Sequence, residues 1–270
     1  MLITKDISKK FYKISYEYLL NNLPQGITKE ILETYLISNH DEYDNLNNIF
    51  KKLTESSRNY QSMPNTINYT KNKDIIDKIL CEYDYKKILK KYNVDLLYEE
   101  FKNNITFNNN TSKKNNWYKW TSSIIDSAKF ISQFETIDDF KNYINCFSYN
   151  ELTKLALPFS ISIEIKGIGY AIACDFLKEI GLEEYCKPDT HIIDVLSKVG
   201  FFTKNENNLL KTQCDAFKTC VKLAKEAEVT PYRLDKIIWL ICTGEYYMHN
   251  IKTIRRKEEY IEYLKNELGD

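Results

Sequence analysis

Residues 165–200 read IKGIGYAIACDFLKEIGLEEYCKPDTHIIDVLSKVG, and this stretch contains the two most informative local patterns of the chain. Gly167 and Gly169 bracket Ile168, and residues without a Cβ atom allow a turn with positive φ that another backbone can approach closely. Apolar residues then recur at helical spacing as far as Gly181, a residue typical of the position just after a helix end. The pattern predicts a turn that opens a helix, and backbone N–H groups at a helix start are suited to holding a phosphate.

A second helix is predicted to begin at Asp189. Pro188 cannot continue a helix, and Asp189 is a favoured N-cap residue. A helix N-terminus stabilises negative charge, so the sequence predicts a fixed carboxylate at this position. The apolar residues behind it recur at i, i+3, i+4 and i+7, namely Ile192, Val195, Leu196 and Val199.

Together these two features resemble the helix-hairpin-helix (HhH-GPD) superfamily of DNA glycosylases, the endonuclease III-like enzymes. The resemblance rests on GIG at the start of one helix and on PDTHI at the start of the next. It is firm over Ile165 to Gly200 and not evident before about Ile75. It implies that Asp189 is the catalytic residue and that the hairpin binds the DNA backbone through Lys166, Gly167, Ile168, Gly169, Tyr170 and Ala171.

A single carboxylate suffices for the chemistry that the resemblance implies. Breaking an N-glycosidic bond creates positive oxocarbenium character at the sugar, which a nearby carboxylate stabilises while it accepts a proton from the attacking water. The alternative interpretation is that Asp189 is an ordinary N-cap, whose replacement by Ala costs about 1 kcal/mol of stability.

Position 171 departs from the pattern of the bifunctional family members. Those enzymes carry a lysine two residues after the second hairpin glycine, where this chain has Ala171. The lysine amine is needed to attack the sugar and form the Schiff base that leads to strand cleavage. The resemblance therefore implies a monofunctional glycosylase without lyase activity, which leaves an abasic site. Lys166 and Lys187 lie nearby, but both are interpreted as solvated or phosphate-facing.

The target base must leave the helix stack, and an aromatic or apolar pocket usually receives it. Tyr170, beside the hairpin, is the first candidate for this base pocket. The segment NNWYKW contributes Trp117 and Trp120, and Trp239 lies in a short apolar run. For each of these aromatic residues, packing in the core is the alternative interpretation.

Composition places the chain among soluble globular proteins, with 43% hydrophobic and 28% charged residues in a length of 270. Lys and Arg number 38 and Asp and Glu number 38, so the net charge is zero. Affinity for DNA must therefore come from a local basic surface.

The expected partner is double-stranded DNA that contains a modified base. No apolar run is long enough to span a membrane, and the first residues, MLITKDISKK, lack a signal-peptide core. We therefore expect a cytoplasmic monomer that makes no membrane contact. The biological setting is either base-excision repair or defence against modified phage DNA.

No metal or other cofactor is expected. Some relatives hold an iron–sulfur cluster through four closely spaced C-terminal cysteines, but only Cys214, Cys220 and Cys242 follow the catalytic segment here. His191 lies two residues after Asp189, and helical geometry turns such neighbours onto different faces. His191 is instead expected to orient the helix start by hydrogen bonding.

The apolar period is helical almost throughout, which predicts an all-α fold. The family architecture implies two helical domains, with the helix-hairpin-helix motif and an active site in the cleft between them. Residues 75–187 would form a helical barrel that carries the hairpin. Residues 1–74 and 188–270 would form the second domain, and the polar stretches 54–73 and 103–116 would be exposed loops.

Two other functions remain open. One is a non-catalytic helix-hairpin-helix protein that binds DNA while Asp189 merely caps its helix. The other is an interaction or scaffold protein whose GIG turn packs inside its own core.

Overall fold

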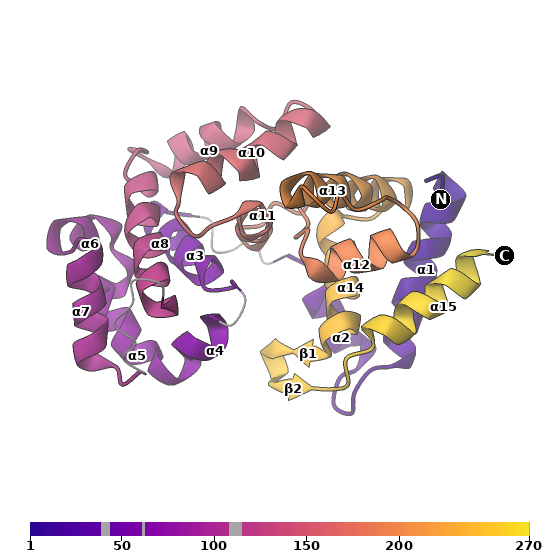
Figure 1. The fold of residues 1–270 in the computed structure, drawn as a ribbon, viewed down its shortest axis with the longest axis horizontal. Coiled ribbons are helices and arrows are strands. Elements are labelled where there is room, and N and C mark those ends of the chain that lie inside the picture. The colour runs from indigo at the N-terminus through magenta and orange to yellow at the C-terminus, as the bar shows by residue number, and fades with distance from the viewer. Residues whose placement is uncertain (39–43, 61–62, 108–114, 270) are drawn as a thin grey trace. The chain divides into compact units, whose positions relative to one another are not determined.

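The computed structural model describes residues 1–38, 44–60, 63–107 and 115–269 (Figure 1). Helices dominate these residues, so the prediction of an all-α fold is confirmed. Two short strands that the sequence does not predict, β1 (Glu245–Tyr246) and β2 (Ile251–Lys252), pair antiparallel. Strands of two residues are too short to show the alternation that marks a strand. No helix in the described part of the chain is long and apolar enough to cross a membrane.

The described residues form two compact units. Unit 1 draws on both chain ends, within Met1–Asn39 and Gly181–Asp270. Its core is formed where α1 from the first segment and α12 from the second each pack against α13, α14 and α15. The helices of unit 1 are α1 (Lys5–Asn21), α2 (Lys29–Tyr35), α12 (Thr190–Lys198), α13 (Leu209–Glu226), α14 (Pro231–Thr243) and α15 (Lys257–Gly269), with the 3-10 turn η2 (Tyr247–His249) between β1 and β2.

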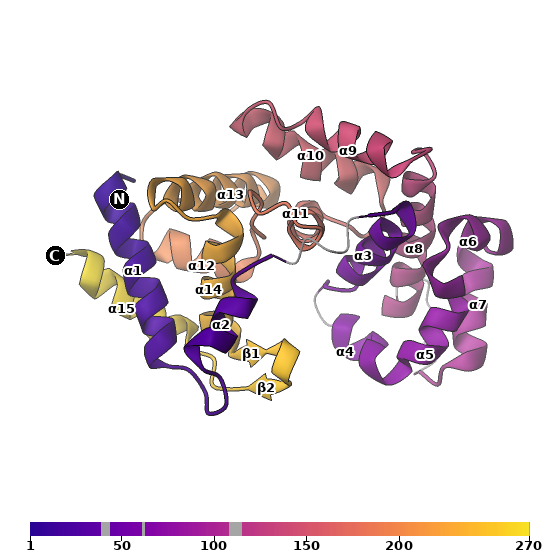
Figure 2. The same ribbon diagram turned by 180° about the vertical axis from the view of Figure 1, so that it is seen from behind.

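Unit 2 lies within His40–Ile180 and is built around one central helix. Figures 1 and 2 both show α8 between α3 on one side and α6 and α7 on the other, and all three pack against it. The helices of unit 2 are α3 (Leu46–Ser57), α4 (Met63–Ile67), α5 (Tyr69–Ile79), α6 (Tyr85–Lys91), α7 (Val94–Asn104), α8 (Asn116–Ile131), α9 (Ile137–Asn145), α10 (Glu151–Glu164) and α11 (Tyr170–Glu179), with the 3-10 turn η1 (Cys81–Tyr83) after α5.

Side-chain caps explain where many of these helices begin. In each case a Thr, Asn or Asp side chain accepts a hydrogen bond from a backbone N–H in the first turn, which satisfies a donor that the helix itself leaves unpaired. Helix α11 differs, because its N-cap is Gly169, which has no side chain to offer. The side-chain caps include Thr4, Thr28, Asn45, Asp84, Asn93, Asn115, Thr136, Asn150, Asp189, Asn208 and Thr230.

The boundaries of the two units differ from those expected at 74/75 and 187/188. Helix α3 packs against α8 and α11, and α4 packs against α8, so both helices belong to unit 2. The segment after Gly181 belongs to unit 1. Glu183 O accepts a hydrogen bond from Tyr232 N at 3.0 Å, and Lys187 N donates to Asp235 Oδ2 at 3.0 Å.

The polar stretch 54–73 was expected to be an exposed loop, and this prediction is wrong for its described residues. It contains the end of α3, all of α4 and the start of α5. Few contacts hold this stretch in place. Met63 and Ile67 are buried, and Trp120 Nε1 donates a hydrogen bond to Thr54 O at 3.1 Å. In the second polar stretch α7 ends at Asn104 and α8 begins at Asn116, while residues 108–114 lie outside the described residues.

Candidate active site and DNA-contacting hairpin

The GIG turn joins α10 to α11 in unit 2. The two apolar residues Ile165 and Ile168 are buried, and Ile168 N donates to Ile165 O at 3.1 Å. Gly167 has φ +89°, a conformation that side chains rarely adopt. Gly169 instead has φ −83° and ψ 173°, which is ordinary extended backbone. Only the first glycine is therefore required for its positive φ.

Helix α8 fixes the turn through Ser123, whose side chain is buried. Ser123 Oγ donates to Lys166 O at 2.7 Å. A Cβ atom added to Gly167 would lie 2.6 Å from the same Oγ, closer than real Cβ atoms come to other heavy atoms. The hydroxyl thus occupies the space that a side chain at position 167 would need.

The outer side of the turn is open to solvent. Lys166, Gly167 and Gly169 are exposed, and no atom lies within 4 Å of a Cβ built on Gly169. Gly169 has no side chain to cap α11, and the residue itself is exposed at the start of this helix. An exposed glycine turn at a helix N-terminus matches the geometry that binds phosphate.

A cavity of about 460 Å³ lies against the same turn, entirely within unit 2. The sequence analysis missed most of its lining. The available signal was periodicity, since Tyr118, Lys119 and Ser122 lie on one face of α8 while Trp117 and Trp120 lie on the buried face. The lining residues are Tyr60, Met63, Tyr118, Lys119, Ser122, Ser123, Lys166, Gly167, Ile168 and Gly169.

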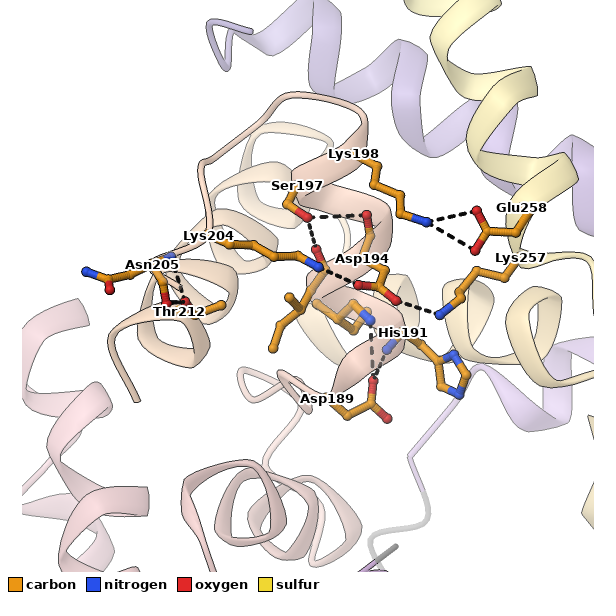
Figure 3. Close-up of polar contacts among 12 residues, drawn as sticks. Asp189, His191, Asp194, Ser197, Lys198, Lys204, Asn205, Thr212, Lys257 and Glu258 are labelled. Atoms are coloured by element: carbon orange, nitrogen blue, oxygen red, sulfur yellow. Dashed lines mark hydrogen bonds and ion pairs between the residues drawn. The ribbon is translucent and has the colours of Figure 1, made fainter. Parts of the chain in front are cut away.

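Asp189 is the N-cap of α12 in unit 1, as predicted. Its Oδ1 accepts hydrogen bonds from His191 N at 2.8 Å and from Ile192 N at 3.3 Å. Within the described residues Oδ2 makes no hydrogen bond, and Figure 3 shows it pointing away from the helix. One oxygen of the carboxylate therefore holds the helix start, and the other is available for chemistry.

A second carboxylate lies further along α12 and is fully paired (Figure 3). Asp194 accepts from Lys204 Nζ and from Lys257 Nζ, each at 2.6 Å. Burial alone would raise the pKa of Asp194, but the two lysines outweigh burial and hold the pKa below its usual value. Because both ammonium groups are engaged by Asp194, they do not compete for Asp189.

His191 was expected to orient the helix start by hydrogen bonding, but only its backbone N–H does so. The ring atom Nδ1 is buried and has no hydrogen-bond partner in the described part of the chain. Burial lowers the pKa of this imidazole below 6.5, against the opposing effect of the Asp189 charge. No group of three His, Cys, Asp or Glu side chains within the described ranges has the geometry to hold a metal ion.

Comparison with known proteins identifies the relatives of this chain. It is 29% identical over 120 residues to an 8-oxoguanine DNA glycosylase/AP lyase of Picrophilus torridus, which covers 44% of this chain and 54% of that protein. It is 28% identical over 82 residues to a protein of the same description from Korarchaeum cryptofilum, which covers 30% of this chain and 39% of the other. The matches thus span about half or less of these curated relatives, and no protein-family model matches.

A solved structure shares the fold. The Methanocaldococcus jannaschii 8-oxoguanine glycosylase/lyase, crystallised with a 15mer DNA containing 8-oxoguanine, superimposes with a TM-score of 0.54 at 19% identity. The alignment covers 87% of this chain and 97% of that one. The chain thus resembles the helix-hairpin-helix DNA glycosylases in sequence and in fold.

The aromatic residues singled out from the sequence lie in different environments. Trp117 and Trp120 are 2% and 0% exposed and pack on Phe101 in the core of unit 2, which agrees with the alternative interpretation of core packing. The physical reason is that their rings fill the space between α7 and α8. Tyr170 is also buried, at 4% exposure.

Trp239 is half-buried on α14 and is the candidate that retains accessible ring surface. Its ring lies edge-on to Tyr247, with 6.0 Å between ring centres and an interplanar angle of 72°. Tyr247 is 48% exposed, and its hydroxyl accepts from Lys236 Nζ at 3.2 Å. The sequence analysis missed Tyr247, which lies in the turn between the two short strands.

The geometry of the turn predicts that Gly167→Ala lowers the free energy of unfolding by about 1–3 kcal/mol. The alanine would have to adopt a φ that residues with a Cβ atom rarely adopt, and its Cβ would clash with Ser123 Oγ. Urea denaturation measures the loss. Gly169→Ala is the matched control and should change stability by less than about 0.5 kcal/mol. Equal losses in the two variants would contradict this account of the turn.

The lowered pKa of His191 predicts a pH dependence of stability. Between the folded-state pKa and the ordinary 6.5, the unfolded chain binds more protons than the folded chain. The free energy that neutral His191 contributes to stability is therefore fully present above pH 6.5 and is lost as the pH falls from 6.5 through the folded-state pKa. In urea titrations from pH 7 to pH 5, His191→Gln should show a smaller loss of unfolding free energy than the wild type. Parallel pH profiles for the two proteins would exclude this role.

Proposed function

We propose that this protein is a DNA glycosylase that hydrolyses the N-glycosidic bond of a flipped-out, modified base. The observation that carries the proposal is Asp189, whose Oδ1 caps α12 while Oδ2 is open. Two further observations support the proposal. The chain also has a glycine hairpin whose outer side is exposed, and it is similar to proteins named as 8-oxoguanine DNA glycosylase/AP lyases.

In the proposed mechanism Asp189 acts on the sugar of the target nucleotide. As the bond to the base lengthens, positive charge develops at C1′ and the carboxylate stabilises it. Oδ2 then accepts a proton from the water that attacks C1′. The base leaves with the electron pair of the broken bond and is protonated by solvent, Asp189 gives its proton back to solvent, and the strand keeps an abasic sugar with a hydroxyl at C1′.

In this mechanism the hairpin binds the DNA backbone. Its glycines permit close approach of a phosphate, and the exposed Lys166 adds positive charge beside the N-terminus of α11. The proposal requires one DNA molecule to contact both the hairpin of unit 2 and Asp189 of unit 1. The chain acts on double-stranded DNA as a monomer, without a cofactor, in the cytoplasm.

The base is proposed to be received by an aromatic surface. Trp239 with the exposed ring of Tyr247 supports this role in unit 1, since stacking on an aromatic face stabilises a base outside the helix. The names of the relatives make 8-oxoguanine the first substrate to test. Other oxidised, alkylated, deaminated or phage-type modified bases follow, and they distinguish a role in repair from one in defence.

The proposed enzyme is monofunctional, although its relatives are named as lyases. Ala171 lies in the first turn of α11, where the resemblance calls for the lysine. A methyl group cannot form a Schiff base with the sugar, so water is the nucleophile.

The alternative function is a non-catalytic protein that binds DNA through the hairpin. One observation favours it, namely that Asp189 makes the ordinary hydrogen bonds of an N-cap. The two functions differ in whether any base is removed.

Asp189→Asn should lower the rate of base removal roughly 100-fold or more, because the amide carries no charge to stabilise the transition state. The assay treats duplexes that carry single modified bases with the protein and then with alkali, which breaks the strand at abasic sites. Asp84→Asn is the matched control, since Asp84 caps α6 in the same way. Equal rates for wild type and Asp189→Asn would leave the non-catalytic alternative.

Ala171→Lys should add lyase activity. The new amine would occupy the position of the family lysine, so strand breaks should form without alkali, and borohydride should trap a covalent protein–DNA complex. The wild type should show neither signal on the same substrate. Trapping of the wild-type protein would overturn the monofunctional assignment.

A further inference from the structure

The cavity beside the hairpin is unsuited to the cleavage step. Within the described part of the chain, none of the residues that line it is Asp, Glu or His. A pocket without a carboxylate or a base cannot stabilise an oxocarbenium ion or activate water. The cavity is therefore suited to binding part of the DNA rather than to cleaving its glycosidic bond.

The walls of the cavity combine two kinds of surface. Tyr60, Tyr118 and Met63 provide aromatic rings and a thioether, while Lys119 and Lys166 provide positive charge. Tyr60 is 39% exposed, and Lys119 Nζ lies 5.9 Å from the centre of its ring. A flat apolar wall beside cations is the combination that binds a nucleotide, with its base stacked and its phosphate paired.

Much of the wall is held in place by contacts within unit 2. Tyr118 donates its hydroxyl hydrogen to Asp95 Oδ1 at 2.9 Å, and Met63 is buried. Ser123 joins α8 to the hairpin through Lys166 O. Figure 1 shows α4 beside α8, and the two helices pack together. The volume of about 460 Å³ falls in the range of small-molecule sites, roughly 300–1,000 Å³.

We propose that this cavity holds one unstacked nucleotide of the bound strand, the immediate neighbour of the nucleotide whose base is excised. Its phosphate lies against the hairpin and the lysines, and its base stacks on Tyr60. The inference rests on the proposed function, because the hairpin must grip DNA for a neighbouring nucleotide to reach the cavity. The nucleotide is the neighbour rather than the target because the base of the target is proposed to stack on Trp239 and Tyr247. Because this base stacks on Tyr60, the affinity for DNA depends on a base that the enzyme does not remove.

The test is a thermodynamic cycle between Tyr60 and the neighbouring base. Three duplexes are compared, each with a tetrahydrofuran abasic analogue at the target position. The first has normal neighbours, the second also lacks the base on the 5′ side, and the third lacks the base on the 3′ side. Dissociation constants for wild type and Tyr60→Ala are measured by fluorescence anisotropy. The cycle isolates the pairwise term because each DNA change is made in both proteins.

Loss of the base on one side should weaken wild-type binding about 10-fold, the size of one base–aromatic stack, and should change Tyr60→Ala binding less than about 2-fold. Tyr60→Phe should keep the wild-type coupling, because it keeps the ring. Tyr149→Ala is the matched control, since Tyr149 is 87% exposed in the same unit and does not line the cavity. Equal losses in wild type and Tyr60→Ala on both sides would overturn the inference.

Salt dependence gives a second readout. Lys119→Ala should reduce the slope of log affinity against log salt by about one, the effect of one lost phosphate contact. Lys129→Ala, on the same helix but outside the lining, should leave the slope unchanged. Because tetrahydrofuran cannot be excised, these measurements do not require catalysis. A wild type that binds none of the duplexes would contradict the proposed function itself.

Discussion

The close contact between the hairpin and α8 is the constraint on which the candidate site of unit 2 depends. Gly167 adopts a positive φ, and Ser123 Oγ takes the space where a side chain would be while it donates to Lys166 O. With Ile165 and Ile168 buried around it, the turn has its glycine backbone on the outside. The exposed start of α11 and the wall of the cavity both follow from this placement.

In the proposed function, Asp189 uses one oxygen for structure and the other for chemistry. Oδ1 satisfies two backbone donors at the start of α12, which fixes the carboxylate without using Oδ2. Lys204 and Lys257 pair with Asp194 and not with Asp189. Further support comes from α14, where Asp235 accepts from Lys187 N and holds the segment that leads to the cap. A fixed and accessible negative charge is the result, and an oxocarbenium ion needs that kind of partner.

The sequence predicted those features that a backbone requirement dictates. A positive φ demands glycine, and an N-cap favours aspartate, so GIG and PDTHI could be interpreted without tertiary information. The role of each aromatic residue could not be inferred in this way. Trp117 and Tyr118 are adjacent in sequence, yet one fills the core against Phe101 and the other lines the cavity. Burial is decided by which helices meet, as is the assignment of α3 and α4 to unit 2.

Position 171 shows how the proposed function can differ from that of relatives with the same fold. The hairpin is held by Gly167, Ser123 and the two buried isoleucines, none of which depends on the side chain at 171. Ala171 is only half-buried in the first turn of α11, so an amine can be present or absent there without disturbing the turn. In the proposed enzyme, the carboxylate chemistry and the binding of the DNA backbone are therefore separable from strand cleavage. Similarity to proteins named as lyases supports the fold, whereas the proposed loss of the lyase step rests on Ala171 alone.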